Sequence, residues 1–194
     1  SLVILRHQVE LDPLNPNAHF QLGSYAIVAG EFDQARQSFE NCVSLGGEAM
    51  IGRCQLAVET EDFETLRNLL AQWRDAEPSA LDAYRPFFEV ILAICDGDLD
   101  KAQSISRQPG AHQESAFIRS YVALWMGEIE LALDGIEMAL ASSEVLAFRF
   151  LHGTLVLRRN YPEYFSHPRY AQILVDFGLD KKSISALRIP QLPF

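Results

Sequence analysis

Hydrophobic residues recur at helical spacing along most of this chain, with polar residues between them. Four segments show the pattern best and contain few runs of β-branched residues: Ala18 to Ala29, Ala49 to Glu59, Leu81 to Cys95, and Ser115 to Met126. Each is followed by a short turn and then a second segment of helical character. The pattern predicts an all-α fold built from pairs of helices.

The second segments resemble one another. The string GEFDQARQSF at 30–39 reappears as EDFETLRNLL at 61–70, GDLDKAQSIS at 97–106 and GEIELALDGI at 127–136. When Phe32, Phe63, Leu99 and Ile129 are aligned, the spacings are 31, 36 and 30 residues. A loose period of this length is typical of proteins made of stacked helical repeats.

The turns within the pairs and those between them differ in composition. A glycine or a short acidic stretch lies within each pair, at 29–31, 60–62, 96–98 and 126–128. Glycine suits the end of a helix because it adopts positive φ without a Cβ clash, and acidic residues favour the next helix N-terminus. Proline and polar clusters at 12–16, 45–48, 77–79 and 108–110 separate one pair from the next, since proline cannot continue a helix.

Residues 15–47, NPNAHFQLGSYAIVAGEFDQARQSFENCVSLGG, resemble the tetratricopeptide repeat (TPR). The residues that match the signature of this family, in the first and the later copies, are Gly23, Gly30, Phe32, Ala35, Phe39, Gly97, Ala102, Gly127 and Ala132. The second copy departs from it, with Glu61 in place of glycine and Leu66 in place of alanine. The resemblance implies a right-handed α–α superhelix, a TPR-like solenoid.

The resemblance divides the chain into repeats and a C-terminal cap. It implies a half repeat at 1–13, repeats at 15–47, 48–78, 79–110 and 111–142, and capping helices with a tail at 143–194. We expect one helix over Val145–Arg159 and another over HPRYAQILVDFGL, with Ser166 as its N-cap and Gly178 as its stop. This last string is similar to the closing helix of bacterial TPR proteins, so we expect the C-terminal part of such a protein.

The family resemblance also implies a concave groove lined by the first helix of each pair. The positions that it places there are Phe20, Ser24, Ile27, Val28, Glu48, Ile51, Gln55, Glu59, Tyr84, Phe87, Ile91, Ile94, Phe117, Tyr121, Leu124 and Trp125. The partner-binding residues that we predict among them are Phe20, Ile27, Tyr84, Phe87, Phe117, Tyr121, Leu124 and Trp125, because exposed aromatic clusters are typical of peptide hot spots. The alternative is that Phe117, Tyr121 and Trp125 pack under C-terminal helices folded back into the groove.

Charge narrows the choice of partner. The net charge is −10, but residues 1–144 carry 9 Lys and Arg against 23 Asp and Glu, whereas 145–194 carry 7 against 3. Nucleic acid is excluded as a partner of this segment because its binding requires clustered cations. We expect a protein or peptide partner with apolar side chains and a basic rim. Phe20 and Ser24 replace the Lys and Asn with which some TPR proteins clamp chaperone tails.

The sequence offers little for catalysis. Phosphate-loop, dinucleotide, metalloprotease and hydrolase motifs are absent, and the five histidines are scattered. Cys42, Cys54 and Cys95 form no CxxC pair, so we expect buried reduced thiols, a cytoplasmic location with the periplasm as the alternative, no cofactor and no metal. No stretch is long and apolar enough for a membrane span.

We therefore expect a non-catalytic interaction scaffold that binds a peptide or partner domain, as the regulatory or docking part of a larger bacterial protein. The alternative from a different class is a self-assembling module, such as a homodimer, that associates through an apolar end at Leu2, Val3 and Leu5. An unrecognised enzyme is a remote third.

Overall fold

The computed structural model describes residues 2–77, 82, 84–106, 115–142 and 155–186, and within these ranges the chain is helical with no strand. The predicted all-α class is therefore confirmed. The helices are α1 (Leu2–Leu11), α2 (Pro16–Ala29), α3 (Phe32–Ser44), α4 (Met50–Glu59), α5 (Phe63–Asp75), α6 (Arg85–Cys95), α7 (Leu99–Ser106), α9 (Ala116–Trp125), α10 (Ile129–Ala141), α12 (Leu155–Asn160), α13 (Pro162–Phe165), α14 (Pro168–Asp176) and α15 (Lys181–Ala186).

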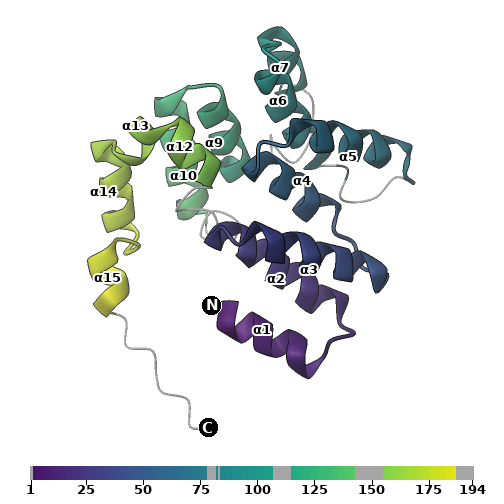
Figure 1. Cartoon of the computed structure of the whole chain (residues 1–194). Coiled ribbons are helices and arrows are strands. Elements are labelled where there is room, and N and C mark those ends of the chain that lie inside the picture. Colours follow the sequence, from purple (N-terminus) through teal and green to yellow (C-terminus); the bar gives the residue numbers. More distant parts are fainter. Residues whose placement is uncertain (1, 78–81, 83, 107–114, 143–154, 187–194) are drawn as a thin grey trace.

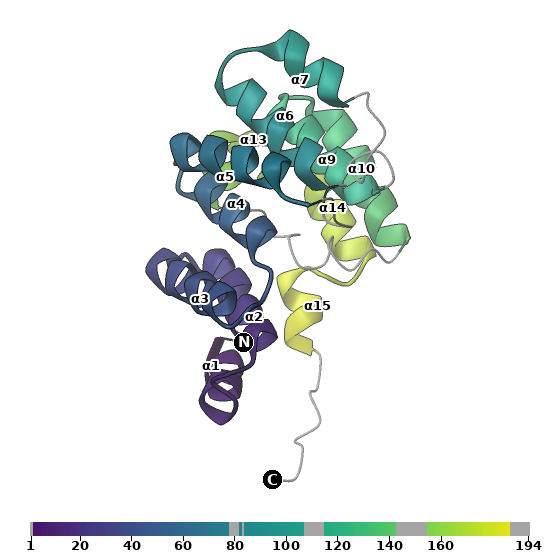
Figure 2. The same cartoon turned by 90° about the vertical axis from the view of Figure 1, so that its right-hand side faces the viewer.

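Eight of these helices form four antiparallel pairs. α2 packs on α3, α4 on α5, α6 on α7 and α9 on α10, and neighbouring pairs contact each other through α3 and α4, α5 and α6, and α6 and α9. We call α2, α4, α6 and α9 the first helices and their mates the second helices. Figures 1 and 2 show the first three pairs following one another from α1, and α12 to α14 lying beside α9 and α10.

The same hydrogen-bonded turn closes every pair. In the first, the N–H of Gly30 donates to Ile27 O and that of Glu31 to Ala26 O, both at 2.9 Å. The bonds repeat at equivalent positions in the other three pairs, at 2.9 to 3.1 Å. The residue at the turn has positive φ each time: 77° at Gly30, 55° at Glu61, 76° at Gly97 and 75° at Gly127. The sequence repeat thus corresponds to a repeated local structure, in which Glu61 adopts a conformation that normally favours glycine.

Small or well-packed residues lie where the two helices of a pair cross. Ala35, Leu66, Ala102 and Ala132 occupy equivalent positions in the second helices, and all four have no exposed surface. Leu66 shows that this position also accepts a larger side chain. What the four share is complete burial against the first helix of the pair, as close packing of helices requires.

The ring of Phe39 fills the space between the first pair and α4. A Cβ atom added to Gly23 of α2 would lie 2.7 Å from this ring, and one added to Gly52 of α4 would lie 2.4 Å from it. Phe39 is 1% exposed and its ring is surrounded by both glycines, so neither can gain a side chain without moving it. The two glycines therefore allow α2 and α4 to approach the same aromatic ring.

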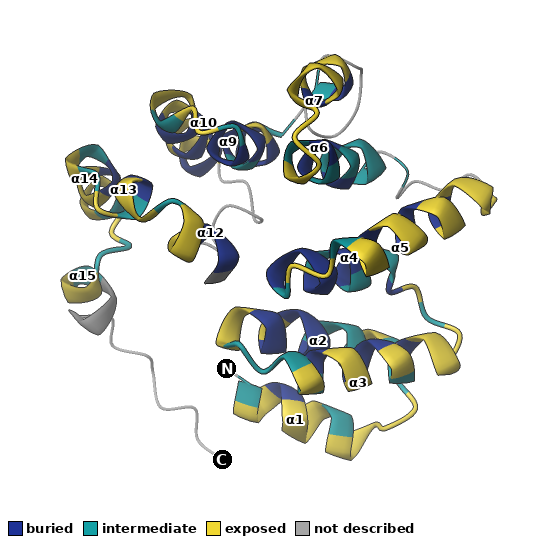
Figure 3. Cartoon of the chain, turned by 45° about the horizontal axis from the view of Figure 1, so that its top comes forward, coloured by how far each residue is buried: buried dark blue, intermediate teal, exposed yellow. Residues whose placement is uncertain are grey.

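Buried side chains form two clusters. The smaller consists of Ala26, Ile27, Ala35, Phe39, Cys42, Ala49 and Leu56, from the first pair and α4. The larger extends from Cys54 in α4 through α5 to α10 and on to Ile173 in α14. Figure 3 shows this burial along α4 and α9, whereas α5 and α7 carry long exposed faces. α4 contributes to both clusters and so connects them.

The C-terminal helices are fixed to the acidic body by a charged cluster. Arg169 of α14 reaches Glu130, Asp134 and Glu137 of α10 at 3.2, 2.6 and 2.8 Å, and these hydrogen bonds raise the pKa of its guanidinium. The N-cap of α14 is His167, whose Nδ1 accepts from Arg169 N at 3.3 Å. The prediction of Ser166 as N-cap was wrong, because its hydroxyl donates to Pro162 O at 2.9 Å.

The end of α14 agrees with the prediction, whereas the helix predicted before it is described only in part. α14 ends at Asp176, and Gly178 follows with φ of 67°, as its role as a stop predicts. Most of the helix predicted over Val145–Arg159 lies outside the described residues, and the described part begins with α12.

We expect Gly52→Ala to lower the free energy of unfolding by about 1–2 kcal/mol, because the new methyl group would collide with Phe39. In an exposed helix the same change usually stabilises by about 1 kcal/mol, so the sign itself tests the packing. Chemical denaturation would measure the change, with Ala71→Leu on the exposed face of α5 as the control, expected within about 0.5 kcal/mol. Stabilisation by Gly52→Ala would contradict this account.

Candidate functional site: an apolar groove

The four first helices converge on one pocket of about 340 Å³. Its lining residues are Phe20 and Ser24 of α2, Ile51, Gly52, Gln55 and Val58 of α4, Tyr84 just before α6, Phe87, Phe88 and Ile91 of α6, and Phe117, Ile118 and Tyr121 of α9. Among the described residues that line it, none comes from a second helix. The pairs are thus oriented so that the same helix of each pair faces the pocket.

Aromatic rings make up much of the wall and contact one another edge to face. The Phe87 and Tyr121 centroids are 5.1 Å apart with an interplanar angle of 62°, so α6 and α9 are joined across the pocket. Phe87 also meets Phe88 at 4.9 Å, and Phe117 lies 6.1 Å from Tyr121. Edge-to-face pairs hold the rings in defined orientations while leaving their free faces available for contact.

Helix starts position several of these rings. Ser115 caps α9, its hydroxyl accepting from Ile118 N at 3.2 Å, which places Phe117 and Ile118 in the first turn. Pro86 lies in the first turn of α6, immediately before Phe87. Proline is accepted there because the first N–H groups of a helix have no partner within it. These local signals fix where each helix starts and therefore which residues face the pocket.

The pocket is almost free of polar groups. None of its described lining residues is charged. The Ser24 hydroxyl is bonded within its own helix, donating to Phe20 O at 2.9 Å. The Gln55 amide is half-buried and forms no hydrogen bond with any described residue, so it is available to a ligand. A neutral, apolar group is what such a surface accepts, because an ion here would lose its hydration without compensation.

The structure places five of the eight predicted partner-binding residues at this pocket: Phe20, Tyr84, Phe87, Phe117 and Tyr121. The other three do not line it. Ile27 is 2% exposed and belongs to the smaller core, and Leu124 and Trp125 are 3% and 4% exposed in the larger one. Val28 and Glu48 are exposed, and Glu59 and Ile94 also lie away from the pocket wall.

Four lining residues were not predicted: Gly52, Val58, Phe88 and Ile118. Phe88 and Ile118 directly follow predicted positions, at 87 and 117, and Val58 directly precedes one, at 59. An apolar helix face is wide enough to present two consecutive residues. These lining residues could therefore have been recognised from the sequence as apolar neighbours of the predicted positions. Gly52 was overlooked because its role is to admit Phe39 close to α4.

One turn beyond the pocket, the groove is covered by the chain itself. Glu59 of α4 is buried, and its Oε2 accepts from Val156 N of α12 at 3.2 Å. The Tyr161 hydroxyl donates to Trp125 O at 2.7 Å, and the two rings lie 6.3 Å apart. Burial raises the pKa of Tyr161 and keeps this donor protonated. Of the two predicted arrangements, the covered one therefore holds at Trp125. Tyr121 is half-buried at the pocket wall, and Phe117 lines the pocket but is only 8% exposed.

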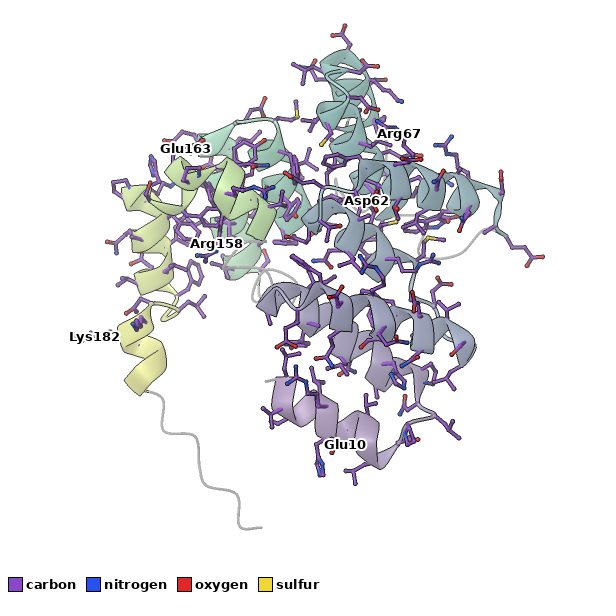
Figure 4. All side chains as sticks on the ribbon, in the orientation of Figure 1. Glu10, Asp62, Arg67, Arg158, Glu163 and Lys182 are labelled. Atoms are coloured by element: carbon purple, nitrogen blue, oxygen red, sulfur yellow. The ribbon has the colours of Figure 1, made fainter. Side chains whose placement is uncertain are left out.

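Surface charges near the turns form ordinary helix-end contacts. Arg67 of α5, labelled in Figure 4, forms an ion pair with Asp96, and Asp98 Oδ1 accepts from Lys101 N at 3.0 Å as a cap. The guanidinium carbon of Arg158, which is also labelled in Figure 4, lies 5.1 Å from the centroid of the Phe165 ring. Within the described part of the chain, no group of three or more His, Cys, Asp or Glu could hold a metal ion.

Comparisons of this chain with known protein families, with curated proteins and with solved structures find no match. Within the described ranges, no helix combines the length and the apolar character that crossing a bilayer requires. The geometry of the groove therefore carries the functional argument.

The thiols are held in their protonated form. Cys42 and Cys54 are buried as predicted, but the prediction of a buried thiol was wrong for Cys95, which is exposed. Burial raises the pKa of Cys54 to about 12, and partial desolvation together with Asp96 and Glu61 raises that of Cys95 to about 11. Burial also raises the pKa of Cys42. Since the thiolate is the nucleophile, these pKa values oppose thiol chemistry near neutral pH.

At pH 8 we expect iodoacetamide to modify Cys95 at least roughly a hundredfold more slowly than an unstructured cysteine peptide, because the raised pKa leaves little thiolate. The rate should rise about tenfold between pH 8 and pH 9, well below that pKa. Peptide mass spectrometry would measure both, with urea-unfolded protein as the control. Rapid labelling of the folded chain at pH 8 would refute the expectation.

Proposed function

We propose that this chain is a TPR-like stack of helix pairs that binds another polypeptide in its groove and does not itself catalyse a reaction. The observation that carries the proposal is the convergence of all four first helices on one apolar pocket. A repeat architecture produces such a surface because equivalent residues of successive repeats face the same side.

The chemistry of the pocket supports a polypeptide partner. Large, rigid aromatic side chains bury much area at a small entropic cost, and they dominate the hot spots of protein interfaces. Tyr84, Phe87 and Tyr121 are half-buried, so part of each ring remains available. They lie on or beside helices that are anchored in the larger core, which limits the ordering that binding would require.

The recurring geometry supports the TPR-like part of the proposal. The pairs share one turn geometry and one fully buried crossing position at Ala35, Leu66, Ala102 and Ala132. We propose that repeats over 1–142 form a right-handed superhelix and that 143–194 form its cap. In this proposal the chain is the docking or regulatory part of a larger bacterial protein of the cytoplasm.

The groove makes a direct prediction. We expect Tyr121→Ala and Phe87→Ala each to weaken binding of peptides retained by the wild-type chain on an unbiased peptide array by at least about tenfold, because either change removes one ring of the Phe87–Tyr121 pair. The matched control is Leu131→Ala, which removes an exposed apolar side chain from α10, away from the pocket. Affinities would be measured by fluorescence anisotropy, with melting curves to verify folding. The proposal would be refuted if the array retained no peptide, or if both pocket variants bound the retained peptides as tightly as the wild-type chain.

A second function, self-association, is favoured by the outer face of α1. Val3, Ile4 and Leu11 on this helix and Leu14 after it are 72%, 60%, 73% and 75% exposed. The sequence had indicated Leu2, Val3 and Leu5, but Leu5 is buried and Leu2 packs against the smaller core. An exposed apolar stripe on a helix is a surface against which a second copy can pack.

If self-association through this stripe is the function, the wild-type chain should sediment as a dimer or larger species at tens of micromolar. Ile4→Glu/Leu11→Glu should then be monomeric, because each new carboxylate would have to be desolvated in the interface. Analytical ultracentrifugation would measure both. A monomeric wild-type chain removes this function and leaves the groove proposal untouched.

A further inference from the structure

The section of groove occupied by α12 continues directly into the open pocket. On α4, Gln55 lines the pocket and Glu59, four residues later, holds Val156. On α9, Tyr121 lines the pocket and Trp125, four residues later, holds Tyr161. Residues four apart lie one turn, about 5.4 Å, along the same helix face. Two adjacent sections of one surface therefore differ only in whether the chain itself covers them.

The covering segment has a simple chemical pattern. Its sequence from 155 to 161 is LVLRRNY. The adjacent apolar residues Val156 and Leu157 are each 1% exposed in the larger core. Arg159 follows and forms an ion pair with Glu61, in the turn after α4. Tyr161 then packs against Trp125.

Acidic residues lie at both ends of the α4 face. Glu48 is exposed and precedes Ile51 by about one turn, while Glu59 and Glu61 lie at the other end. The lining between them, from Ile51 to Val58, carries no charge. An apolar centre with a carboxylate beyond its end is complementary to a segment whose apolar residues are followed by a basic one.

We infer that α12 and Tyr161 are a built-in ligand of the groove, and that the external partner is a peptide segment of the same pattern, with two adjacent apolar residues followed by a basic one, which displaces α12 from the groove. This inference rests on the proposed function and specifies the partner of the same site. Glu61 gives independent support, because it keeps a strained positive φ where the other three turns have glycine. Its side chain supplies the carboxylate that binds Arg159, which glycine could not provide.

Three fluorescein-labelled peptides would test the inference on the full chain. The first is LVLRRNY itself, the second has both arginines replaced by glutamate, and the third has the adjacent Val and Leu replaced by serine. We expect the first to bind at least about tenfold more tightly than either other peptide, and its affinity to fall as salt screens the carboxylates. The inference is overturned if the three bind equally or the first does not bind.

Two variants distinguish binding in the groove from nonspecific binding of a basic peptide to an acidic protein. Tyr121→Ala should weaken binding of the first peptide at least about tenfold, whereas Leu131→Ala on the outer face should leave it unchanged. Arg159→Glu should loosen the built-in ligand and so strengthen binding of the first peptide several-fold, as release of a competitor does. Unchanged or weaker binding by a folded Arg159→Glu variant contradicts the built-in ligand.

Failure here is distinguishable from failure of the proposed function. If the unbiased array yields peptides that depend on Phe87 and Tyr121 but have no basic residues, the groove binds polypeptides and only the inferred pattern is wrong. If no peptide of any composition depends on these two rings, the proposed function and the inference both fail.

Discussion

The positive-φ turn that closes each helix pair is the constraint on which the other features depend. It reverses the chain within two or three residues, so the second helix must return along the first. Because the same turn occurs four times, α2, α4, α6 and α9 are presented in the same sense. Their adjacent apolar residues can then form one surface even though Phe20 and Phe117 are far apart in sequence.

The sequence was most informative where local physics decides the structure. Helical spacing located the four first helices, and glycine or acidic residues located the turns between Gly30 and Glu128. Nine predicted groove positions, five of them among the predicted partner-binding residues, line the pocket because the resemblance and the helix period agree there. These signals act over one or two turns of helix, so they could be recognised without knowledge of the tertiary packing.

The missed features depend on contacts between distant segments. Packing of Trp125 under the C-terminal helices was one of the two predicted arrangements, but its contact with Tyr161 and that of Glu59 with Val156 have no local signature from which to choose it. The N-cap of α14 was misassigned because Ser166 and His167 both precede Pro168 and both can cap a helix, and the Ser166 hydroxyl instead bonds back to Pro162 of α13. Leu66, a departure from the repeat signature in the sequence, occupies the crossing position that alanine takes in the other three pairs, so local spacing alone does not define the packing there.

The division of buried side chains into two clusters has a mechanical consequence for the pocket. Phe20 and Ser24 belong to a helix of the smaller cluster, whereas Phe87, Phe117 and Tyr121 contact the larger one, and α4 bridges the two. A ligand bound there would contact helices of both clusters. Its binding would restrict motion of one cluster relative to the other, and the affinity would depend on the free energy of holding the two in one relative position.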